Sequence, residues 1–446
     1  MNPTSKLSAR RIAHVIGVDY MGEDKKISKL VWKSKECCPG CCYIAIRGEK
    51  YDGNDFIEEA RSRGAELIIT DTYAVSRSDE YLTVENSKIA LGQLAKDYAK
   101  NIKIIGITGS AGKTTVKEMI KTVMSEKYSV TATLNNENNE IGVAKTLLSC
   151  SDEEFCIVEM GMRARGEIAY LAELCRPETS IITNSGSAHI GLLGSSKEIF
   201  NAKTEIIEYT RKYCILPNEE RFIKLQKNNL SSIYVGDRGD FSAENIEYCK
   251  SGVEYSVYNK CFNLGRIFIP TFSKHNITNS LFAYSVGNIY GIEHESIANA
   301  LKCFTNTKMR EEILSINNIC LVVDCYNASY EGMKSAIESF NNYCTLKNLS
   351  PNLVLGLMKE MGDYSDEYHY RIGEYAKDIG IHSLIVYGES GEKYTDGYCG
   401  GKVINDKNTL AQFILSNYGS GDAILFKGSR SVRMEEIINE MKELMK

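Results

Sequence analysis

Lys113 and Thr114 close a glycine-rich segment whose residue types suit the binding of phosphate groups. The segment runs Gly109-Ser110-Ala111-Gly112-Lys113-Thr114-Thr115, and its two glycines let the backbone curl so that successive N–H groups point at phosphate oxygens. The lysine ammonium can reach the β- and γ-phosphates, and the hydroxyl of Thr114 can bind Mg²⁺. The segment therefore predicts a nucleoside triphosphate site.

The residues on either side of this segment supply the elements that such a site needs. An apolar run at 103–107 predicts a strand, and apolar residues spaced i, i+3, i+4, i+7 and i+8 from Val116 predict a helix. The amino end of that helix would add its positive dipole to the phosphate site. One feature departs from the usual G-x-x-x-x-G-K-[ST] spacing, because Ile107 stands where that pattern has its first glycine.

Three more side chains could take part in chemistry at this site. Glu159 ends an apolar strand, where its carboxylate can face the site from the carboxyl edge of a sheet; the alternative is a surface glutamate. His189 lies in a loop rich in glycine and serine that follows another strand, although a lone histidine can equally be structural. Lys203 is either an ordinary lysine on a helix surface or a buried lysine with a lowered pKa.

A nucleoside also needs polar side chains that read its base and its ribose. Asn276 and Asn279 are three residues apart on a predicted helix, so they share one face and could read adenine through their amides. Asp324 ends the predicted strand 319–323, where its carboxylate could accept ribose hydroxyls. These residues come from separate parts of the chain, so we expect the site to assemble when domains close.

Strand-like and helix-like runs alternate along the chain, which predicts an α/β protein of three domains. Residues 1–100 are predicted to form a smaller amino-terminal α/β domain. Residues 101–310 are predicted to form a central domain whose mostly parallel sheet carries the phosphate loop. Residues 311–446 are predicted to form a carboxy-terminal, Rossmann-like α/β domain.

Composition excludes several other classes of protein. The chain has 53 Lys and Arg against 58 Asp and Glu, a net charge of −5, which argues against a nucleic-acid partner. No apolar run reaches the roughly 18–20 residues of a membrane span, and no secretory signal is visible at the amino end. We therefore expect a cytoplasmic protein.

Cysteine is unusually frequent, with 15 residues, and four of them cluster in Cys37-Cys38-Pro39-Gly40-Cys41-Cys42. These four thiols could hold a soft metal, but no second pair with C-x-x-C spacing accompanies them elsewhere in the chain. The alternative, which we prefer, is a tight turn at Pro39-Gly40 between two short strands.

The phosphate loop resembles that of the Mur ligase family, the ATP-dependent amide ligases of peptidoglycan precursor synthesis. Further segments match this family in its own order, from about residue 30 to residue 435. They are Gly48–Phe56, Asn135–Gly142, Glu159–Met162, Thr183-Asn184 with Ala188-His189, Asn201–Ile206, His275-Asn276 with Asn279, Asp324–Ala328 and Lys427–Ser431.

The resemblance implies an ATP- and Mg²⁺-dependent ligase that forms an acyl phosphate, which an amine then attacks. The implied partners are UDP-N-acetylmuramoyl-tripeptide, held by residues 1–100, and D-alanyl-D-alanine, with residues 311–446 closing on ATP and this acceptor. The resemblance also implies a carbamate on Lys203, which would turn the cation into an anion able to support Mg²⁺. We expect such an enzyme to be a monomer.

The resemblance assigns roles to individual residues of this chain. The catalytic residues would be Lys113, Glu159, His189 and Lys203. The metal ligands would be Thr114, Glu159, Lys203 and His189. ATP would contact Gly109, Ser110, Ala111, Gly112, Lys113, Thr114, Thr115, Asn276, Asn279, Arg310 and Asp324. The other substrates would contact Ser34, Gly48, Asp52, Gly53, Asn138, Asn139, Asn327, Lys427, Ser429 and Arg430.

The chain departs from the family where the substrates would be recognised. Lys33-Ser34-Lys35 replaces the family's Asp-Ser-Arg, Ser329-Tyr330 replaces Asn-Pro or Ser-Pro, and Leu357 replaces an aspartate, while His369 is retained. One alternative is therefore a paralogue that joins other partners in a specialised pathway. Another is an ATP-binding regulator without ligase activity, against which the presence of Lys113, Glu159 and Lys203 argues.

Overall fold

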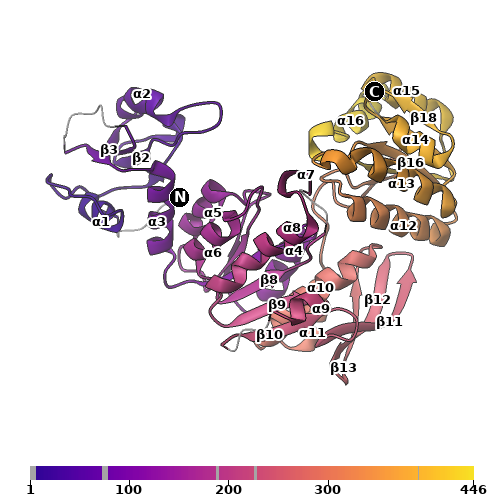
Figure 1. Ribbon diagram of the computed structural model, residues 1–446, viewed down its shortest axis with the longest axis horizontal. Coiled ribbons are helices and arrows are strands. Elements are labelled where there is room, and N and C mark those ends of the chain that lie inside the picture. Colours follow the sequence, from indigo (N-terminus) through magenta and orange to yellow (C-terminus); the bar gives the residue numbers. More distant parts are fainter. Residues whose placement is uncertain (1–6, 73–78, 187–189, 226–228, 390) are drawn as a thin grey trace. The chain divides into compact units, whose positions relative to one another are not determined.

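The computed structural model describes residues 7–72, 79–186, 190–225, 229–389 and 391–446 (Figure 1). The chain divides into two compact units. The first contains residues 1–106, 128–161 and 169–178, and the second contains residues 107–127, 162–168 and 179–446. Among the described residues, none of the helices has the length and apolar character needed to cross a membrane.

The first unit contains a small parallel sheet with strand order β1-β2-β3-β4. Its strands are β1 (Leu30–Val31), β2 (Cys41–Ile44), β3 (Ala65–Thr70) and β4 (Tyr81–Thr83). Its helices are α1 (Ala9–Val15), η1 (Ser34–Glu36), η2 (Gly53–Phe56), α2 (Ile57–Ser62) and α3 (Ser87–Tyr98). Every residue of β2 is buried, as expected for a parallel strand covered on both faces.

The cysteine cluster forms the turn that enters β2, so the prediction of a turn is confirmed. The N–H of Cys41 donates to the carbonyl of Cys38 (3.1 Å), and Gly40 has φ +79°, a conformation that favours glycine. The strands on either side, β1 and β2, are parallel. Within the described ranges no group of three or more His, Cys, Asp or Glu side chains is placed to hold a metal ion.

The central sheet has nine strands in the order β13-β12-β11-β10-β9-β8-β5-β7-β6. The strands are β5 (Lys103–Thr108), β6 (Val130–Ala132), β7 (Phe155–Glu159), β8 (Thr179–Ile182), β9 (Tyr213–Pro217), β10 (Ser231–Val235), β11 (Phe241–Cys249), β12 (Gly252–Asn259) and β13 (Phe262–Ile269). The pairs β6–β7, β8–β9, β9–β10 and β10–β11 are parallel, which confirms the mostly parallel sheet.

Strands β11, β12 and β13 are antiparallel to one another, and the predicted strand–helix alternation missed them. Short turns connect them, one at Lys250-Ser251 and one near Lys260, which has φ +54°. The associated helices are α4 (Lys113–Met124), α5 (Glu140–Ser149), α6 (Glu167–Cys175), α7 (Ile190–Leu193), α8 (Ser196–Thr204), η3 (Glu205–Tyr209), α9 (Glu220–Ile223), α10 (Lys274–Ile289) and α11 (His294–Lys302).

The last sheet has the order β14-β15-β19-β16-β17-β18, and every pair except β14–β15 is parallel. Its strands are β14 (Glu312–Ile316), β15 (Ile319–Val323), β16 (Ser350–Gly356), β17 (Ser383–Tyr387), β18 (Lys402–Ile404) and β19 (Asp422–Lys427). Its helices are α12 (Tyr330–Lys347), η4 (Gly362–Tyr364), α13 (Ser365–Asp378), α14 (Glu392–Tyr398), α15 (Lys407–Asn417), η5 (Arg430–Val432) and α16 (Glu435–Leu444).

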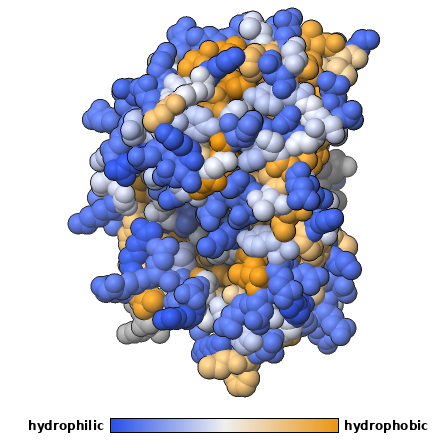
Figure 2. Space-filling view, turned by 90° about the vertical axis from the view of Figure 1, so that its right-hand side faces the viewer, coloured by the Kyte–Doolittle hydropathy of each residue, from blue (hydrophilic) through white to orange (hydrophobic). Residues whose placement is uncertain are grey.

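Helices cover both faces of this sheet, as the Rossmann-like prediction requires. Helices α12 and α13 pack on one face around Phe340 and Ile372, and α15 and α16 pack on the other around Ile414 and Ile437 (Figure 1). The α/β fold with three sheets is thus confirmed. Hydrophilic residues predominate on the face shown in Figure 2, where apolar residues form small separate groups.

Candidate active site

The phosphate loop joins β5 to α4, as predicted. Ile107 is fully buried within β5, so the loop starts after Thr108, and this explains the shorter glycine spacing. The ammonium of Lys113 folds over the loop and donates to the carbonyl of Gly109 (2.7 Å). Gly112 has φ +81°, and a Cβ there would lie 2.7 Å from Oδ1 of Asn279. Both facts favour glycine at position 112.

The segment that follows β8 fixes the shape of this loop. The N–H of Ala111 donates to Oδ1 of Asn184 (3.0 Å), and the hydroxyl of Thr183 donates to the carbonyl of Ala111 (2.5 Å). The hydroxyl of Ser110 donates to the carbonyl of Gly186 (3.2 Å). The sequence reasoning used Thr183-Asn184 only as a matching motif and missed this supporting role. The predicted histidine of this segment, His189, lies outside the described residues.

Lys203 is an interior residue, so the alternative of a helix-surface lysine is wrong. It lies in α8 and is 1% exposed. Burial lowers the pKa of its ammonium well below the ordinary lysine value, and the positive charge of Lys113 lowers it further. This shift favours the neutral amine form of Lys203, beside the charge of Lys113. A neutral amine of this kind is a nucleophile, whereas an ammonium is not.

Arg310 reaches the phosphate loop from the segment between α11 and β14. Its guanidinium donates to the hydroxyl of Thr114 (3.1 Å) and lies 4.1 Å from the centre of the Tyr326 ring. Its neighbours Met309 and Glu311 both adopt left-handed φ values, +62° and +48°. The structure thus brings Arg310 and Thr114 together, and both were predicted ATP contacts.

Glu159 belongs to the first unit and is also an interior residue, so the alternative of a surface glutamate is wrong. It ends β7, is 1% exposed, and accepts a hydrogen bond from Nδ2 of Asn138 (2.9 Å). Its own N–H donates to the hydroxyl of Thr133 (3.0 Å). Asn139, predicted with Asn138 as a substrate contact, caps α5 with its side chain, which accepts from the N–H of Gly142 (3.0 Å).

A chain of buried polar side chains extends from Asn279. Nδ2 of Asn279 donates to Oδ1 of Asn276 (2.9 Å), which confirms that the two amides share one face of α10. Nδ2 of Asn276 donates to the hydroxyl of Thr271 (2.8 Å), and that hydroxyl donates to Oε2 of Glu311 (2.5 Å). Thr271 and Glu311 were not predicted; for Glu311 the only signal was its position directly after Arg310.

Asp324 and Lys427, both predicted as ligand contacts, pair with each other. The ammonium of Lys427 donates to Oδ2 of Asp324 (2.5 Å) and to the carbonyl of Asn327 (3.2 Å), and Lys427 is 5% exposed. The hydroxyl of Ser429 accepts from the N–H of Lys359, and Arg430 forms an ion pair with Glu435. These predicted contacts lie at the carboxyl ends of β15 and β19.

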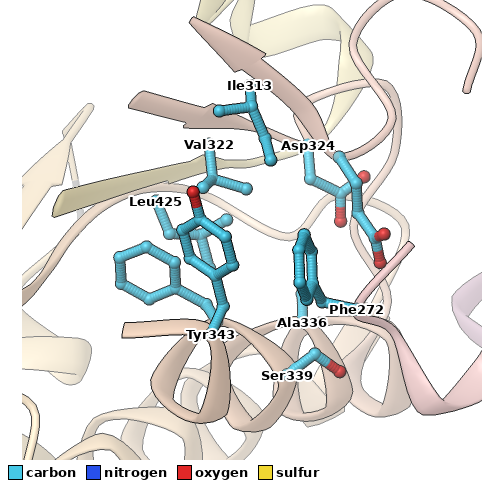
Figure 3. A pocket seen from close by; sticks show the side chains of 10 residues that line it. Phe272, Ile313, Val322, Asp324, Ala336, Ser339, Tyr343 and Leu425 are labelled. Atoms are coloured by element: carbon cyan, nitrogen blue, oxygen red, sulfur yellow. The ribbon is translucent and has the colours of Figure 1, made fainter. Parts of the chain in front are cut away.

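Glu311 and Asp324 also line a small hollow whose other walls are mainly apolar (Figure 3). The rings of Phe272 and Tyr343 meet edge to face across it, with centres 4.5 Å apart. Burial, helped by the nearby carboxylate of Asp324 and opposed by the hydrogen bond from Thr271, raises the pKa of Glu311 to about 7. Glu311 is therefore protonated in a large fraction of molecules at neutral pH.

This raised pKa predicts a stability effect of Glu311→Gln that depends on pH. Between about pH 4.5 and 7 the unfolded chain ionises this carboxyl while the folded chain holds its proton, so wild-type stability falls with rising pH and then levels off. Glutamine cannot ionise. The free energy of unfolding of the variant minus that of wild type should therefore be about 2 kcal/mol larger at pH 8 than at pH 5. Urea unfolding of both proteins at the two pH values measures this difference. An equal difference between the two proteins at both pH values would contradict the shift.

In the first unit, most of the predicted substrate contacts take part in local hydrogen bonds. The hydroxyl of Ser34 donates to Oε2 of Glu59 (2.6 Å), which lowers the pKa of that carboxyl. Asp52 accepts from the N–H of Asn54 (2.9 Å) at the start of η2. The N–H of Gly53 donates to the carbonyl of Ile46, and that of Gly48 to the carbonyl of Tyr51.

A phosphate loop at the junction of β5 and α4, on a mostly parallel sheet, defines a nucleotide-binding α/β protein. Sequence profiles for three Mur ligase domains match the chain. They are the Mur ligase family catalytic domain (residues 26–105), the Mur ligase middle domain (107–287) and the Mur ligase glutamate ligase domain (309–430). The chain belongs to the Mur ligase family.

Individual relatives within this family are similar over nearly the whole chain. A UDP-N-acetylmuramoyl-tripeptide–D-alanyl-D-alanine ligase of Bacillus subtilis is 32% identical over 419 residues, 90% of each chain. The structure of MurF ligase from Thermotoga maritima in complex with ADP has 26% identity and a TM-score of 0.85, covering 95% of this chain and 99% of that one. MurF from Acinetobacter baumannii, 24% identical, shares the fold with a TM-score of 0.90 over 99% of this chain and 100% of that one.

Proposed function

We propose that this chain is an ATP-dependent ligase that joins D-alanyl-D-alanine to UDP-N-acetylmuramoyl-tripeptide in peptidoglycan precursor synthesis. The activity is that of the Bacillus subtilis relative, which is 32% identical. The observation that carries the proposal is the buried Lys203, with its lowered pKa, beside Lys113 and its phosphate loop. A protein that only sensed ATP would have no use for this second lysine.

The proposed reaction has two steps. A carboxylate oxygen of the tripeptide attacks the γ-phosphorus of ATP, the bond to the bridging oxygen breaks, and ADP leaves. The amine of D-alanyl-D-alanine then attacks the acyl carbon, loses a proton and expels inorganic phosphate. The protein has to hold the reacting atoms in line, neutralise phosphate charge and keep water away from the acyl phosphate.

Residues of the second unit hold the nucleotide in this proposal. The N–H groups of Gly109 to Thr115 and the ammonium of Lys113 bind the β- and γ-phosphates, and Arg310 adds a positive charge at Thr114. Asn276 and Asn279 read the adenine, and Asp324 accepts the ribose hydroxyls. The structure of the Thermotoga relative is a complex with ADP, which supports nucleotide binding by a protein of this fold.

The donor groups present fit Mg²⁺, which prefers oxygen ligands. Thr114 offers a hydroxyl and Glu159 a buried carboxylate, while the Lys203 amine becomes an oxygen donor only as a carbamate. Its neutral form can attack CO₂, giving a carbamate and one proton. Bound Mg²⁺ would neutralise phosphate charge, and His189 would contact the metal or a phosphate.

The UDP end of the donor would lie on the first unit, against Ser34, Gly48, Asp52, Gly53, Asn138 and Asn139. The acceptor would lie on the carboxyl edge of the last sheet, near Asn327, Lys427, Ser429 and Arg430. The enzyme would work in the cytoplasm, where ATP is available, and as a monomer.

Phosphate release by the purified protein tests this function. UDP-N-acetylmuramoyl-tripeptide, D-alanyl-D-alanine and ATP are supplied together and then omitted one at a time, and the product mass is measured. Release that requires all three, with a product of ligated mass, is the expected result. Release that occurs only with a different acceptor or a different donor would favour the paralogue. The departures at Tyr330 and Leu357 motivate this alternative.

A further inference from the structure

Glu311 ends a chain of polar side chains, and the proposed mechanism assigns it no role. Arg310, the residue before it, donates to the hydroxyl of Thr114, which fixes this segment beside the phosphate loop. Oε2 of Glu311 accepts from the hydroxyl of Thr271 and lies 3.5 Å from Nδ2 of Asn276. Thr271 and Asn276 are buried, so water competes little for these hydrogen bonds.

The hydroxyl of Thr271 has its hydrogen-bond direction fixed by its neighbours. Its oxygen accepts from the N–H of Ser273 (3.4 Å) and from Nδ2 of Asn276 (2.8 Å). A hydroxyl oxygen has two lone pairs and one hydrogen, so its hydrogen donates to the remaining neighbour, Oε2 of Glu311. An ionised carboxylate can only accept. The ionised Glu311 therefore sets the direction in which the chain of hydrogen bonds runs.

This direction determines which way round two amides face. The oxygen and the nitrogen of an amide have nearly the same shape, so their hydrogen bonds decide which one stands where. Nδ2 of Asn276 faces Thr271 and Glu311, and its Oδ1 accepts from Nδ2 of Asn279 (2.9 Å). Turning over one amide alone would place two donors or two acceptors against each other, which is costly in a buried position. The two amides therefore turn over together or not at all.

The other end of the chain lies at the nucleotide site. A Cβ built on Gly112 would lie 2.7 Å from Oδ1 of Asn279, so this amide borders the phosphate loop. In this orientation Asn279 offers Oδ1 as an acceptor beside Nδ2 as a donor. Adenine presents an amine donor beside a ring-nitrogen acceptor, which fits this order. Guanine has a carbonyl acceptor in place of the amine, so it fits the reversed order.

We infer that Glu311 and Thr271 are positioning residues that fix the orientation of the Asn276 and Asn279 amides and thereby select adenine over guanine nucleotides. This inference rests on the proposed use of ATP and adds the residues that determine its base selectivity. Glutamine at position 311 has nearly the same shape as glutamate, but its amide donates as well as accepts. It allows both directions of the chain, so it separates the shape of the side chain from the direction that the carboxylate imposes.

Calorimetric binding of ADP and GDP to the purified protein tests this selection and needs neither of the other ligase substrates. At pH 8 the wild-type protein should bind ADP about tenfold or more tightly than GDP. Glu311→Gln should weaken ADP binding by only about twofold, because about half of the molecules keep the competent orientation, and should reduce the ratio of ADP to GDP affinity by about tenfold. An unchanged ratio, or equal weakening of both nucleotides, would overturn the inference. A wild-type protein that binds neither nucleotide would contradict the nucleotide site itself, and the inference with it.

Variants of Thr271 test the link between Glu311 and the amides. Thr271→Val removes the hydroxyl with little change in shape and should lower the ratio of ADP to GDP affinity as Glu311→Gln does. Thr271→Ser keeps a hydroxyl and should restore the ratio. Ser339→Ala removes a hydroxyl from the hollow beside Glu311, outside the chain, and should keep the wild-type ratio. The same ratio in the valine and serine variants would overturn the role of Thr271.

The pH dependence of this ratio supplies a second readout. Burial raises the pKa of Glu311 to about 7, and below this pH the neutral acid carries an O–H that can donate into the chain. The wild-type ratio should therefore fall by about tenfold between pH 8 and pH 6, whereas that of Glu311→Gln should not change. The other charged and titratable groups that face Glu311 act on ADP and GDP alike; they are Asp324, Lys427, Tyr248 and Tyr343. A wild-type ratio that is independent of pH would contradict control by the carboxylate.

Discussion

Replacing Lys113 by methionine should reduce ATP-dependent ligation by about a hundredfold to a thousandfold, the usual loss when one preorganised charge stabiliser is removed. The ammonium of Lys113 lies within the loop, 2.7 Å from the carbonyl of Gly109. A phosphate in the loop would receive this charge without any rearrangement of the backbone. Methionine has a similar length and no charge, so it isolates the electrostatic contribution.

The measurement is kcat/KM for ATP, with binding of ADP followed separately by calorimetry. Lys121→Met is the matched control, because Lys121 is an exposed lysine near the end of the same helix. The control should keep wild-type activity. Wild-type activity in Lys113→Met would mean that the phosphates are not bound at this loop.

Lys203→Met should have an effect of similar size for a different reason. Lys203 is buried, and burial together with the charge of Lys113 lowers the pKa of its ammonium, which favours the neutral amine that carbamate formation with CO₂ requires. Methionine keeps the apolar bulk but cannot bind CO₂. We expect ligation to fall by about a hundredfold or more, as when a positioned charge is lost from an active site.

The carbamate itself can be tested without measuring activity. Wild-type protein supplied with ¹³C-bicarbonate should show a carbamate signal in its ¹³C spectrum, and Lys203→Met should lack it. Lys197→Met, which replaces an exposed lysine on the same helix, should keep both the signal and the activity. An active wild-type protein with no carbamate signal would contradict this role for Lys203.

The sequence alone was sufficient to predict features that depend on residues close together in the chain. The phosphate loop was predictable because a strand, two glycines, a lysine and a helix follow one another directly. The shared face of Asn276 and Asn279 was predictable because helical spacing alone determines it. The turn at Pro39-Gly40 is equally local, and so are the end of β7 at Glu159 and the end of β15 just before Asp324.

Features that depend on distant parts of the chain were not predictable. The sequence left two alternatives for Lys203, and only its packing within the second unit decides that it is buried. The hydrogen bonds of Glu311 join it to Asn276 and Thr271, which are 35 and 40 positions away in the sequence. The stacked rings of Tyr330 and Tyr368 join the starts of α12 and α13, which follow different strands. The antiparallel strands β11–β13 were missed because the alternation of strands and helices stops there.

The residues that depart from the family pattern lie in different surroundings. Lys33 is exposed and forms an ion pair with Glu36 (3.4 Å), so its charge is partly balanced on the surface. Tyr330 instead joins a ring stack, and Leu357 packs on the core. Tyr330 and Leu357 therefore both pack against the apolar core of the last sheet, whereas Lys33 pairs with a neighbour on the surface.

The central claim is that a carboxylate is activated by ATP through an acyl phosphate. The most direct test uses a tripeptide donor whose reacting carboxylate, the one that becomes joined to the acceptor amine, carries ¹⁸O at both oxygens. ATP and D-alanyl-D-alanine are supplied with it. The account predicts that each phosphate released carries one ¹⁸O atom and that the ligated product keeps the other. Phosphate that contains no ¹⁸O, with ATP consumed, would mean that water attacks ATP directly and would contradict the account.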